Sequence, residues 1–366
     1  MFEPYALGPI TLANRLVMNP MTRSRSNGAG LAGAMMADYY SQRASAGLII
    51  TEGVAPTPSG KGYARIPGIW NQKQVESWKP VTAAVHAKGG RIFMQLMHTG
   101  RISHSANMSN GATILAPSAL AAPGQMYTDS LGLQGHPVPH AMNEDEILQA
   151  IATFAKAAAN VVAAGFDGVE LHGANGYLIE QFLSPVTNQR KDAWGGSVKA
   201  RLRFALEVAK SVVAAIGGDK VGMRLSPYGV NGGMAAYPEV DETYLALAAG
   251  LDALGLVYLH LADHQGMGAP AVPAALRQGL RKAWTRSLLI GGSFDQATAE
   301  QALSQGQCDL VGFGRAFLAN PDLVARWTEG KPLNPVDATT FFTPGIKGYT
   351  DYPALPGAEA AAPVVA

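Results

Sequence analysis

Three side chains in the segment His172-Gly-Ala-Asn175-Gly-Tyr177 could act together on one small molecule. His172 and Asn175 are three positions apart, so they share one face of a starting helical turn and could hold one substrate oxygen. Tyr177, with an ordinary pKa of about 10, keeps its proton at neutral pH and could donate it. The alternative is a strand-end histidine, a capping asparagine and a half-buried tyrosine. Because the segment leaves a predicted strand, we expect a catalytic role.

A second group of residues could bind a phosphate. Gly291-Gly292 would let backbone N–H groups approach an anion, and a helix beginning near Asp295 would add its dipole. Gly314-Arg315 follows a later strand and supplies a guanidinium fork. The alternative is two ordinary turns with a surface arginine.

These residues follow short apolar runs that alternate with longer amphipathic stretches. Such runs are typical of strands buried on both faces of a parallel sheet. Repeated strand–helix units predict an α/β fold, either a (β/α)8 TIM barrel or a large open sheet, and we expect the barrel, with its site at the carboxyl ends of the strands. The expected strands are 15–20, 47–54, 90–97, 166–172, 220–226, 255–261, 286–291 and 307–314.

Three helix starts can be predicted from capping residues. Asn71 and Asn143 are each followed three positions later by Gln or Glu, which is capping-box spacing. Asn320-Pro321 predicts a third helix start, with proline at the first helical position.

Two segments exceed what a minimal barrel needs. Residues 2–14 contain a Gly-Pro turn and are expected to form an N-terminal hairpin that closes the barrel floor. Residues 98–140 separate the third strand from its helix, and so long a connection predicts an inserted lid. We expect one domain over 1–355 and a disordered tail over 356–366.

Composition excludes several classes of protein. The 366 residues carry 28 Lys and Arg against 27 Asp and Glu, so a dedicated nucleic-acid binder is not expected. No apolar run is long enough to span a membrane, and the first residues do not resemble a signal peptide. The single cysteine, Cys308, cannot form an internal disulfide and is expected inside the eighth strand. We expect a soluble cytoplasmic protein.

Six motifs together resemble the old yellow enzyme family, which comprises FMN-dependent ene-reductases on an eight-fold barrel. The resemblance covers about residues 2–355. The motifs are PMTRSRS at 20–26, QLMHTGRISH at 95–104, HGANGYLIEQFLSPVTNQR at 172–190, MRLSP at 223–227, GFGRAFLANPDL at 312–323 and GYTDYP at 348–353.

The resemblance implies a non-covalent FMN site. Thr22 would bond the flavin C4 carbonyl, Gln95 would bind the pyrimidine edge, and Arg224 would lie beside N1, where reduced flavin carries negative charge. The glycines of the later strands and Arg315 would hold the phosphate. The full set of cofactor residues is Pro20, Met21, Thr22, Gly53, Gln95, Arg224, Gly291, Gly292, Gly314 and Arg315.

The resemblance also implies a ping-pong reaction. NADPH or NADH would give hydride to the flavin and leave, and an activated alkene (an enone, enal, maleimide or nitroalkene) would then accept it. His172 and Asn175 would bind the carbonyl or nitro oxygen, and Tyr177 would protonate the α-carbon.

Two expected pocket residues depart from the family pattern. Met97 stands where many relatives carry Trp, and Phe342 where many have Tyr. Tyr63 matches a third pocket residue, with core packing as the alternative. The sequence leaves open the physiological substrate, NADPH or NADH preference, stereoselectivity, and whether the protein is a monomer or a homodimer.

Three other interpretations compete with this one. Gly28-Ala-Gly30-Leu-Ala-Gly33 imitates a dinucleotide fingerprint, but polar residues separate it from the preceding strand. The segment from His260 to His264 could offer metal ligands, although further ligands are not obvious, and we expect no metal. A flavin- or quinone-binding protein without turnover is the third.

Overall fold

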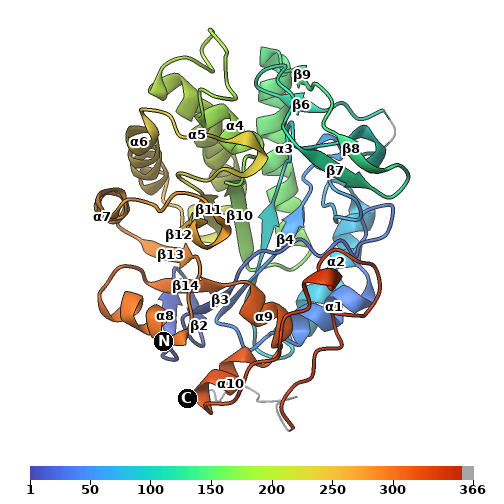
Figure 1. Cartoon of the computed structure of the whole chain (residues 1–366), viewed down its shortest axis with the longest axis vertical. Helices are drawn as coiled ribbons and strands as arrows, with labels where there is room; N and C mark the ends of the chain where they lie inside the picture. The colour runs from blue at the N-terminus through green and yellow to red at the C-terminus, as the bar shows by residue number, and fades with distance from the viewer. Residues whose placement is uncertain (110, 357–366) are drawn as a thin grey trace.

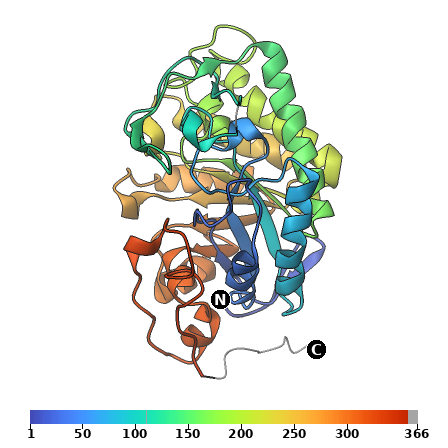
Figure 2. The same ribbon diagram turned by 90° about the vertical axis from the view of Figure 1, so that its right-hand side faces the viewer.

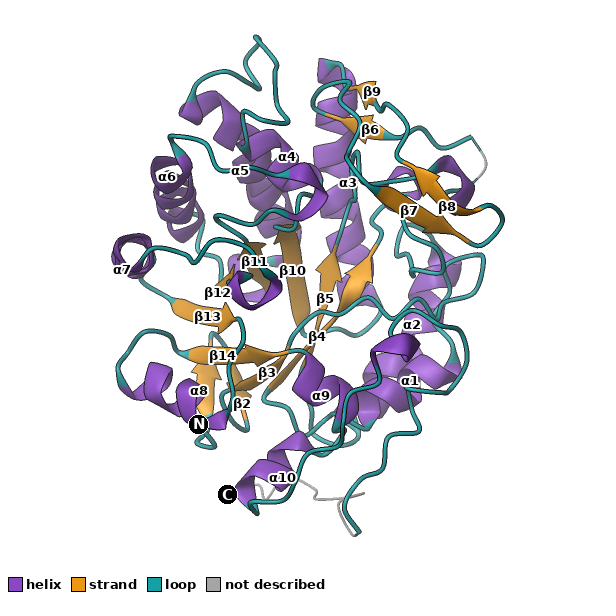
Figure 3. Ribbon diagram, in the orientation of Figure 1, coloured by secondary structure: helices purple, strands orange, loops and turns teal. Residues whose placement is uncertain are grey.

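Eight parallel strands close into a barrel in the computed structural model, which describes residues 1–109 and 111–356 (Figures 1 and 3). The predicted (β/α)8 fold is confirmed. Apart from Pro356, the predicted tail lies outside the described residues. Neighbouring strands around the barrel are β10 (Gly168–Gly173), β11 (Val221–Leu225), β12 (Tyr258–Ala262), β13 (Ser287–Gly291), β14 (Leu310–Phe313), β3 (Leu16–Met18), β4 (Leu48–Val54) and β5 (Ile92–Leu96).

Helices surround the barrel (Figures 2 and 3). Helix α3 begins with the predicted capping box at Asn143, and the Asn71 side chain accepts the Gln74 N–H at the start of α2. The helices are α1 (Ala34–Ser41), α2 (Gln72–His86), α3 (Glu144–Ala163), α4 (Leu178–Leu183), α5 (Val198–Ile216), α6 (Val240–Ala253), α7 (Ala274–Ala283), α8 (Gln296–Ser304), α9 (Arg315–Ala319) and α10 (Leu323–Thr328).

Two local predictions were wrong. Asn320 does not start a helix, because its side chain donates to the Ala316 carbonyl and so closes α9, while α10 begins after Asp322. Cys308 is buried but precedes β14 instead of lying inside it, because the strand begins two residues later.

The predicted N-terminal hairpin closes the barrel floor. Strands β1 (Tyr5–Leu7) and β2 (Ile10–Leu12) pair antiparallel around Gly8, whose φ of +55° suits glycine. The hairpin packs against the lower layer of inward-facing side chains. This apolar cluster contains Leu7, Leu12, Val17, Leu48, Ile50, Phe93, Val257, Tyr258, Leu289 and Leu310.

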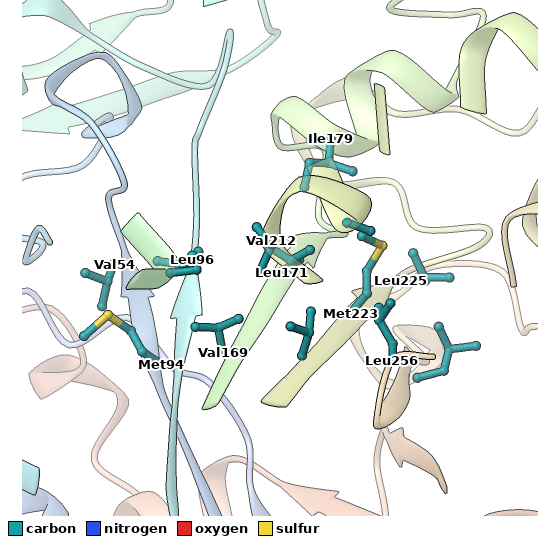
Figure 4. Packing of buried hydrophobic residues seen from close by; sticks show 14 of the residues in the cluster. Val54, Met94, Leu96, Val169, Leu171, Ile179, Val212, Met223, Leu225 and Leu256 are labelled. Atoms are coloured by element: carbon teal, nitrogen blue, oxygen red, sulfur yellow. The ribbon is translucent and has the colours of Figure 1, made fainter. Parts of the chain in front are cut away.

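Side chains along each barrel strand point alternately outward, into the apolar core beneath the helices, and inward, toward the barrel interior. On β10, Leu171 belongs to the apolar layer between the sheet and helices such as α5 (Figure 4). Its neighbours Glu170 and His172 have the opposite parity and face the barrel interior. Above the apolar floor the interior therefore becomes polar, where the strands end.

The insert after β5 contains four short strands. They are β6 (Leu115–Ala116), β7 (Gln125–Thr128), β8 (Gly132–Gly135) and β9 (His140–Ala141), and β7 and β8 form an antiparallel hairpin. The insert and the red C-terminal segment lie toward opposite ends of the long axis (Figures 1 and 2). None of the helices described is both long and apolar enough to cross a membrane.

Candidate active site

A cavity of about 1320 Å³ opens at the carboxyl ends of the barrel strands. It exceeds the ~300–1,000 Å³ of most small-ligand sites, so it has room for a cofactor and a second ligand in contact. The insert and the C-terminal segment each contribute part of its wall. Of the predicted catalytic, cofactor-binding and substrate-pocket residues, those lining it are Pro20, Met21, Thr22, Tyr63, Gln95, Met97, His172, Asn175, Tyr177, Arg224, Gly291, Gly292, Gly314, Arg315 and Phe342.

Gly53 is the exception, because it does not line the cavity. The Met97 side chain covers it, and a Cβ at Gly53 would lie 2.5 Å from Met97 Sδ. The absence of a side chain at Gly53 therefore makes room for Met97.

The strand register sets three nitrogen-bearing side chains next to one another. His172 on β10 is paired with Arg224 on β11, and Arg224 with His260 on β12. Burial, and then the positive charge of Arg224, hold the pKa of His172 well below its usual value. His172 is therefore neutral at pH 7.

The hydrogen bonds of His172 assign its tautomer. The Ala174 N–H lies 3.3 Å from Nδ1, which must accept, so Nε2 carries the proton. Asn175 Nδ2 lies 3.4 Å from that Nε2. Two N–H donors side by side can point at one oxygen and stabilise negative charge developing on it.

Tyr177 places a phenolic proton beside this donor pair. Its ring meets the His172 ring edge-on at 4.9 Å, and its hydroxyl donates to the Tyr63 hydroxyl at 3.0 Å. Burial and the proximity of Tyr63 raise the pKa of Tyr177 well above 10. The phenol thus keeps its proton across the neutral range.

Beneath the cavity, Glu170 is a fully buried carboxylate with three donors. Gln95 Nε2 and His260 Nδ1 each lie 2.8 Å from it, and Tyr258 donates at 3.1 Å. Burial opposes ionisation, but His260, Arg224 and Gln95 outweigh it, so the pKa of Glu170 is lowered. The bond to Gln95 fixes the NH2 end of the amide, leaving its carbonyl end to meet a ligand.

The remaining polar atoms fit a flavin. Within the described chain, Asn19 Oδ1, Asn175 Oδ1, Arg224 Nε and His264 Nδ1 are buried without a hydrogen-bond partner, and all four residues line the cavity. A ring edge carrying carbonyl and N–H groups could satisfy such atoms.

Among the strand-end residues predicted to hold a phosphate, Gly291 has no room for a side chain. A Cβ on Gly291 would lie 2.8 Å from Asn19 Nδ2 and 2.9 Å from His260 Nε2, so a side chain there would collide. Gly314 precedes α9, and the exposed Arg315 reaches the same cavity.

Sequence reasoning missed several lining residues. Asn19, next to the predicted Pro20, had a signal in its strand-end position. Tyr127 and Leu133 of the insert, and Phe341 of the C-terminal segment, had none, because only the fold brings them to the cavity.

The structure argues against two of the competing interpretations, the metal site and the dinucleotide fingerprint. Asp263 pairs with Arg277 at 2.9 Å and His260 with Glu170, and no group of three metal-ligating residues occurs over 1–109 and 111–356. Gly28 lies in the loop between β3 and α1, ten positions beyond the end of β3 at Met18, so it cannot form a strand-to-helix dinucleotide turn.

Comparisons with known proteins agree with this geometry. Residues 1–334 match the NADH:flavin oxidoreductase / NADH oxidase family. The chain is 41% identical over 358 residues to a probable flavin mononucleotide-dependent alkene reductase of Leishmania infantum, covering 96% of this chain and 97% of that protein. It is 38% identical over 362 residues to putative 12-oxophytodienoate reductase 11 of Oryza sativa subsp. japonica, covering 97% and 98%.

Solved structures give the same answer. Morphinone reductase superposes with a TM-score of 0.93 at 41% identity, covering 97% of this chain and 96% of that one. An old yellow enzyme homologue from Zymomonas mobilis gives 0.93 at 39% identity, covering 97% and 99%. Fold and relatives together define an FMN-dependent ene-reductase that takes hydride from NAD(P)H. The chain belongs to the old yellow enzyme family.

Proposed function

We propose that this enzyme reduces the C=C bond of α,β-unsaturated carbonyl or nitro compounds by a ping-pong mechanism. Its substrates would be enones, enals, maleimides and nitroalkenes. The observation that carries the proposal is the pair of donors at His172 Nε2 and Asn175 Nδ2, 3.4 Å apart, beside a protonated Tyr177. The relatives named alkene reductase and 12-oxophytodienoate reductase support it.

Each residue has a distinct role in this proposal. His172 and Asn175 bind the carbonyl or nitro oxygen, withdraw electron density and stabilise the oxyanion as the β-carbon accepts hydride. Tyr177 adds a proton to the α-carbon, so one hydride and one proton complete the reduction. When bound, FMN supplies the hydride-transfer chemistry.

Two groups of cofactor residues would hold the two ends of FMN, one at each end of the cavity. Thr22, Gln95 and Arg224 would hold the ring, and Arg315 with the strand-end glycines would hold the phosphate. NADPH or NADH and the alkene would then use the remaining space in turn, which makes the reaction ping-pong. Residues 1–355 would act as one FMN-binding domain, with 98–140 as a lid.

Tyr177→Phe tests the proton-donor role. We expect the rate of alkene reduction to fall at least about 10²-fold, since general acid catalysis typically contributes that much. The rate at which NADPH or NADH reduces bound FMN should stay within twofold, because that step needs no proton from Tyr177. Stopped-flow absorbance measures the two steps separately. Equal losses in both would remove Tyr177 from this role.

A further inference from the structure

The turn that carries the oxygen-binding asparagine has an unfavourable backbone. Asn175 and Gly176 both have positive φ, +60° and +77°. A side chain at Gly176 would place its Cβ 2.5 Å from the Asn231 carbonyl oxygen. A left-handed conformation at a non-glycine residue persists only where surrounding contacts enforce it.

Two buried side chains supply those contacts. The Asn175 N–H donates to Ser226 Oγ at 2.9 Å, and the Gly176 N–H donates to Glu180 Oε2 at 2.6 Å. Ser226 in turn donates to Glu180 Oε1 at 2.8 Å, so the Glu180 carboxyl group holds the Gly176 N–H directly and the Asn175 N–H through Ser226. The Tyr244 hydroxyl, on α6, donates to the same Oε1 at 2.6 Å.

The position of Glu180 explains how it reaches the turn. Tyr177 is the N-cap of α4 and Glu180 is the third helical residue. In a capping box, an acid at that position bonds the N-cap N–H. Here the carboxylate reaches one residue further back, to Gly176, and so spans Tyr177.

We propose that Glu180 and Ser226 form a brace that positions Asn175 for binding the substrate oxygen and Tyr177 for donating its proton. Neither Glu180 nor Ser226 lines the cavity, so they act through the turn and not on the ligand. This inference rests on the roles proposed above for Asn175 and Tyr177. Without the brace, Asn175 relaxes from its left-handed conformation and its amide moves away from His172 Nε2.

The brace does not depend on one protonation state. The Gly176 N–H can donate to Oε2 of either a carboxylate or a carboxylic acid. The hydroxyl hydrogens of Ser226 and Tyr244 rotate to suit the proton on Oε1, and Ser226 Oγ still accepts from Asn175.

Phenol is the probe for the test, because a phenolate oxygen resembles the oxyanion that His172 and Asn175 would bind. Phenol is titrated into the FMN-loaded enzyme at pH 7 and followed by visible absorption of the flavin, and the Kd for FMN is measured on the same variants. Glu180→Leu and Ser226→Ala should each weaken phenol binding about tenfold. The Kd for FMN should stay within twofold, because the brace touches no cofactor residue.

Tyr244→Phe is the matched control, since it removes a buried hydroxyl bonded to Glu180 but not to the turn. It should leave phenol affinity within twofold. In an Asn175→Ala background, Ser226→Ala should add less than a twofold loss, because the brace acts through Asn175.

Other outcomes distinguish a failure of the proposed oxygen-binding role from a failure of the brace. If Asn175→Ala itself leaves phenol affinity unchanged, the proposed oxygen-binding role fails and the brace with it. If Asn175→Ala weakens phenol binding but Ser226→Ala and Glu180→Leu do not, the brace alone is wrong. A parallel loss of FMN in the brace variants, or a full tenfold loss added by Ser226→Ala to Asn175→Ala, would also overturn it.

Discussion

Two buried glutamates, ten positions apart, differ in the direction of their pKa shifts. Glu170 points into the barrel beneath the cavity, and Glu180 lies in α4 behind the substrate-binding turn; their side chains are 0% and 2% exposed. Burial opposes ionisation of both. His260 and Arg224 nevertheless hold the pKa of Glu170 below its usual value, whereas burial raises the pKa of Glu180 to about 7.

The difference lies in the neighbours and not in the depth of burial. Glu170 accepts hydrogen bonds from two side chains of the barrel wall and from His260, and Arg224 adds a nearby positive charge. Glu180 accepts from two hydroxyls and one backbone N–H, and the charge of Arg224 lowers its pKa less than any of these three hydrogen bonds does. Glu170 is thus a fixed negative charge beneath the cavity, whereas Glu180, part of the brace, changes its protonation state near neutral pH.

Replacing each glutamate with leucine should give the largest difference in stability between the two sites. Glu170→Leu leaves three buried donors without an acceptor and Arg224 without its countercharge, so we expect a loss of at least about 4 kcal/mol in the free energy of unfolding. Glu180→Leu should cost only about 2 kcal/mol at pH 7, because it also removes a carboxylate that is costly to ionise. Urea unfolding of the FMN-loaded protein measures both. Equal losses would contradict the difference in charge that we assign to Glu170 and Glu180.

The dependence of stability on pH should separate the two sites next. The pKa of Glu180 is about 7 when folded and 4.5 as the reference value, so between these pH values the folded state binds the extra proton. Its contribution to stability therefore falls as pH rises, by roughly 2 to 3 kcal/mol between pH 5 and pH 8.

Glu180→Gln should remove this loss, so the variant gains stability relative to the wild type as pH rises. Glu170→Gln is the matched control. The pKa of Glu170 is lowered, so its stabilising contribution is lost only as pH falls below its usual range, and its cost should be constant from pH 5 to pH 8. Unfolding midpoints across this range decide the matter, and a flat difference for Glu180→Gln would contradict the assigned shift.

The smallest effect should come from removing one tyrosine hydroxyl that donates a hydrogen bond to each carboxyl group. At pH 6, Tyr258→Phe removes a hydrogen bond to an ionised Glu170 and should cost about 2 kcal/mol. Tyr244→Phe removes a bond to a mostly protonated Glu180 and should cost about 1 kcal/mol. The reverse order in urea unfolding would mean that the charge states are exchanged.

Local sequence was sufficient for many parts of this molecule. The strand runs, the Asn143 cap and the N-terminal hairpin each depend on residues close together in the chain, and the structure confirms them. The helix start predicted at Asn320 was wrong because its side chain donates to the Ala316 carbonyl at the end of the preceding helix. Residue spacing alone does not show which of two adjacent helices an asparagine caps. The packing around Gly53 could not be predicted either, because it depends on Met97, which directly follows the neighbouring strand β5.

Local sequence patterns are enough to predict the barrel and the types of side chain at the ends of its strands. Hydrophobic period and turn residues act over a few positions, so His172, Asn175 and Tyr177 could be found together. The three-dimensional fold sets the tautomer of His172, the opposite pKa shifts of Glu170 and Glu180, and the hydrogen bond from Asn175 to Ser226. Those properties depend on distances between strands far apart in the chain and on how much water the packing excludes, and neither is encoded in local spacing.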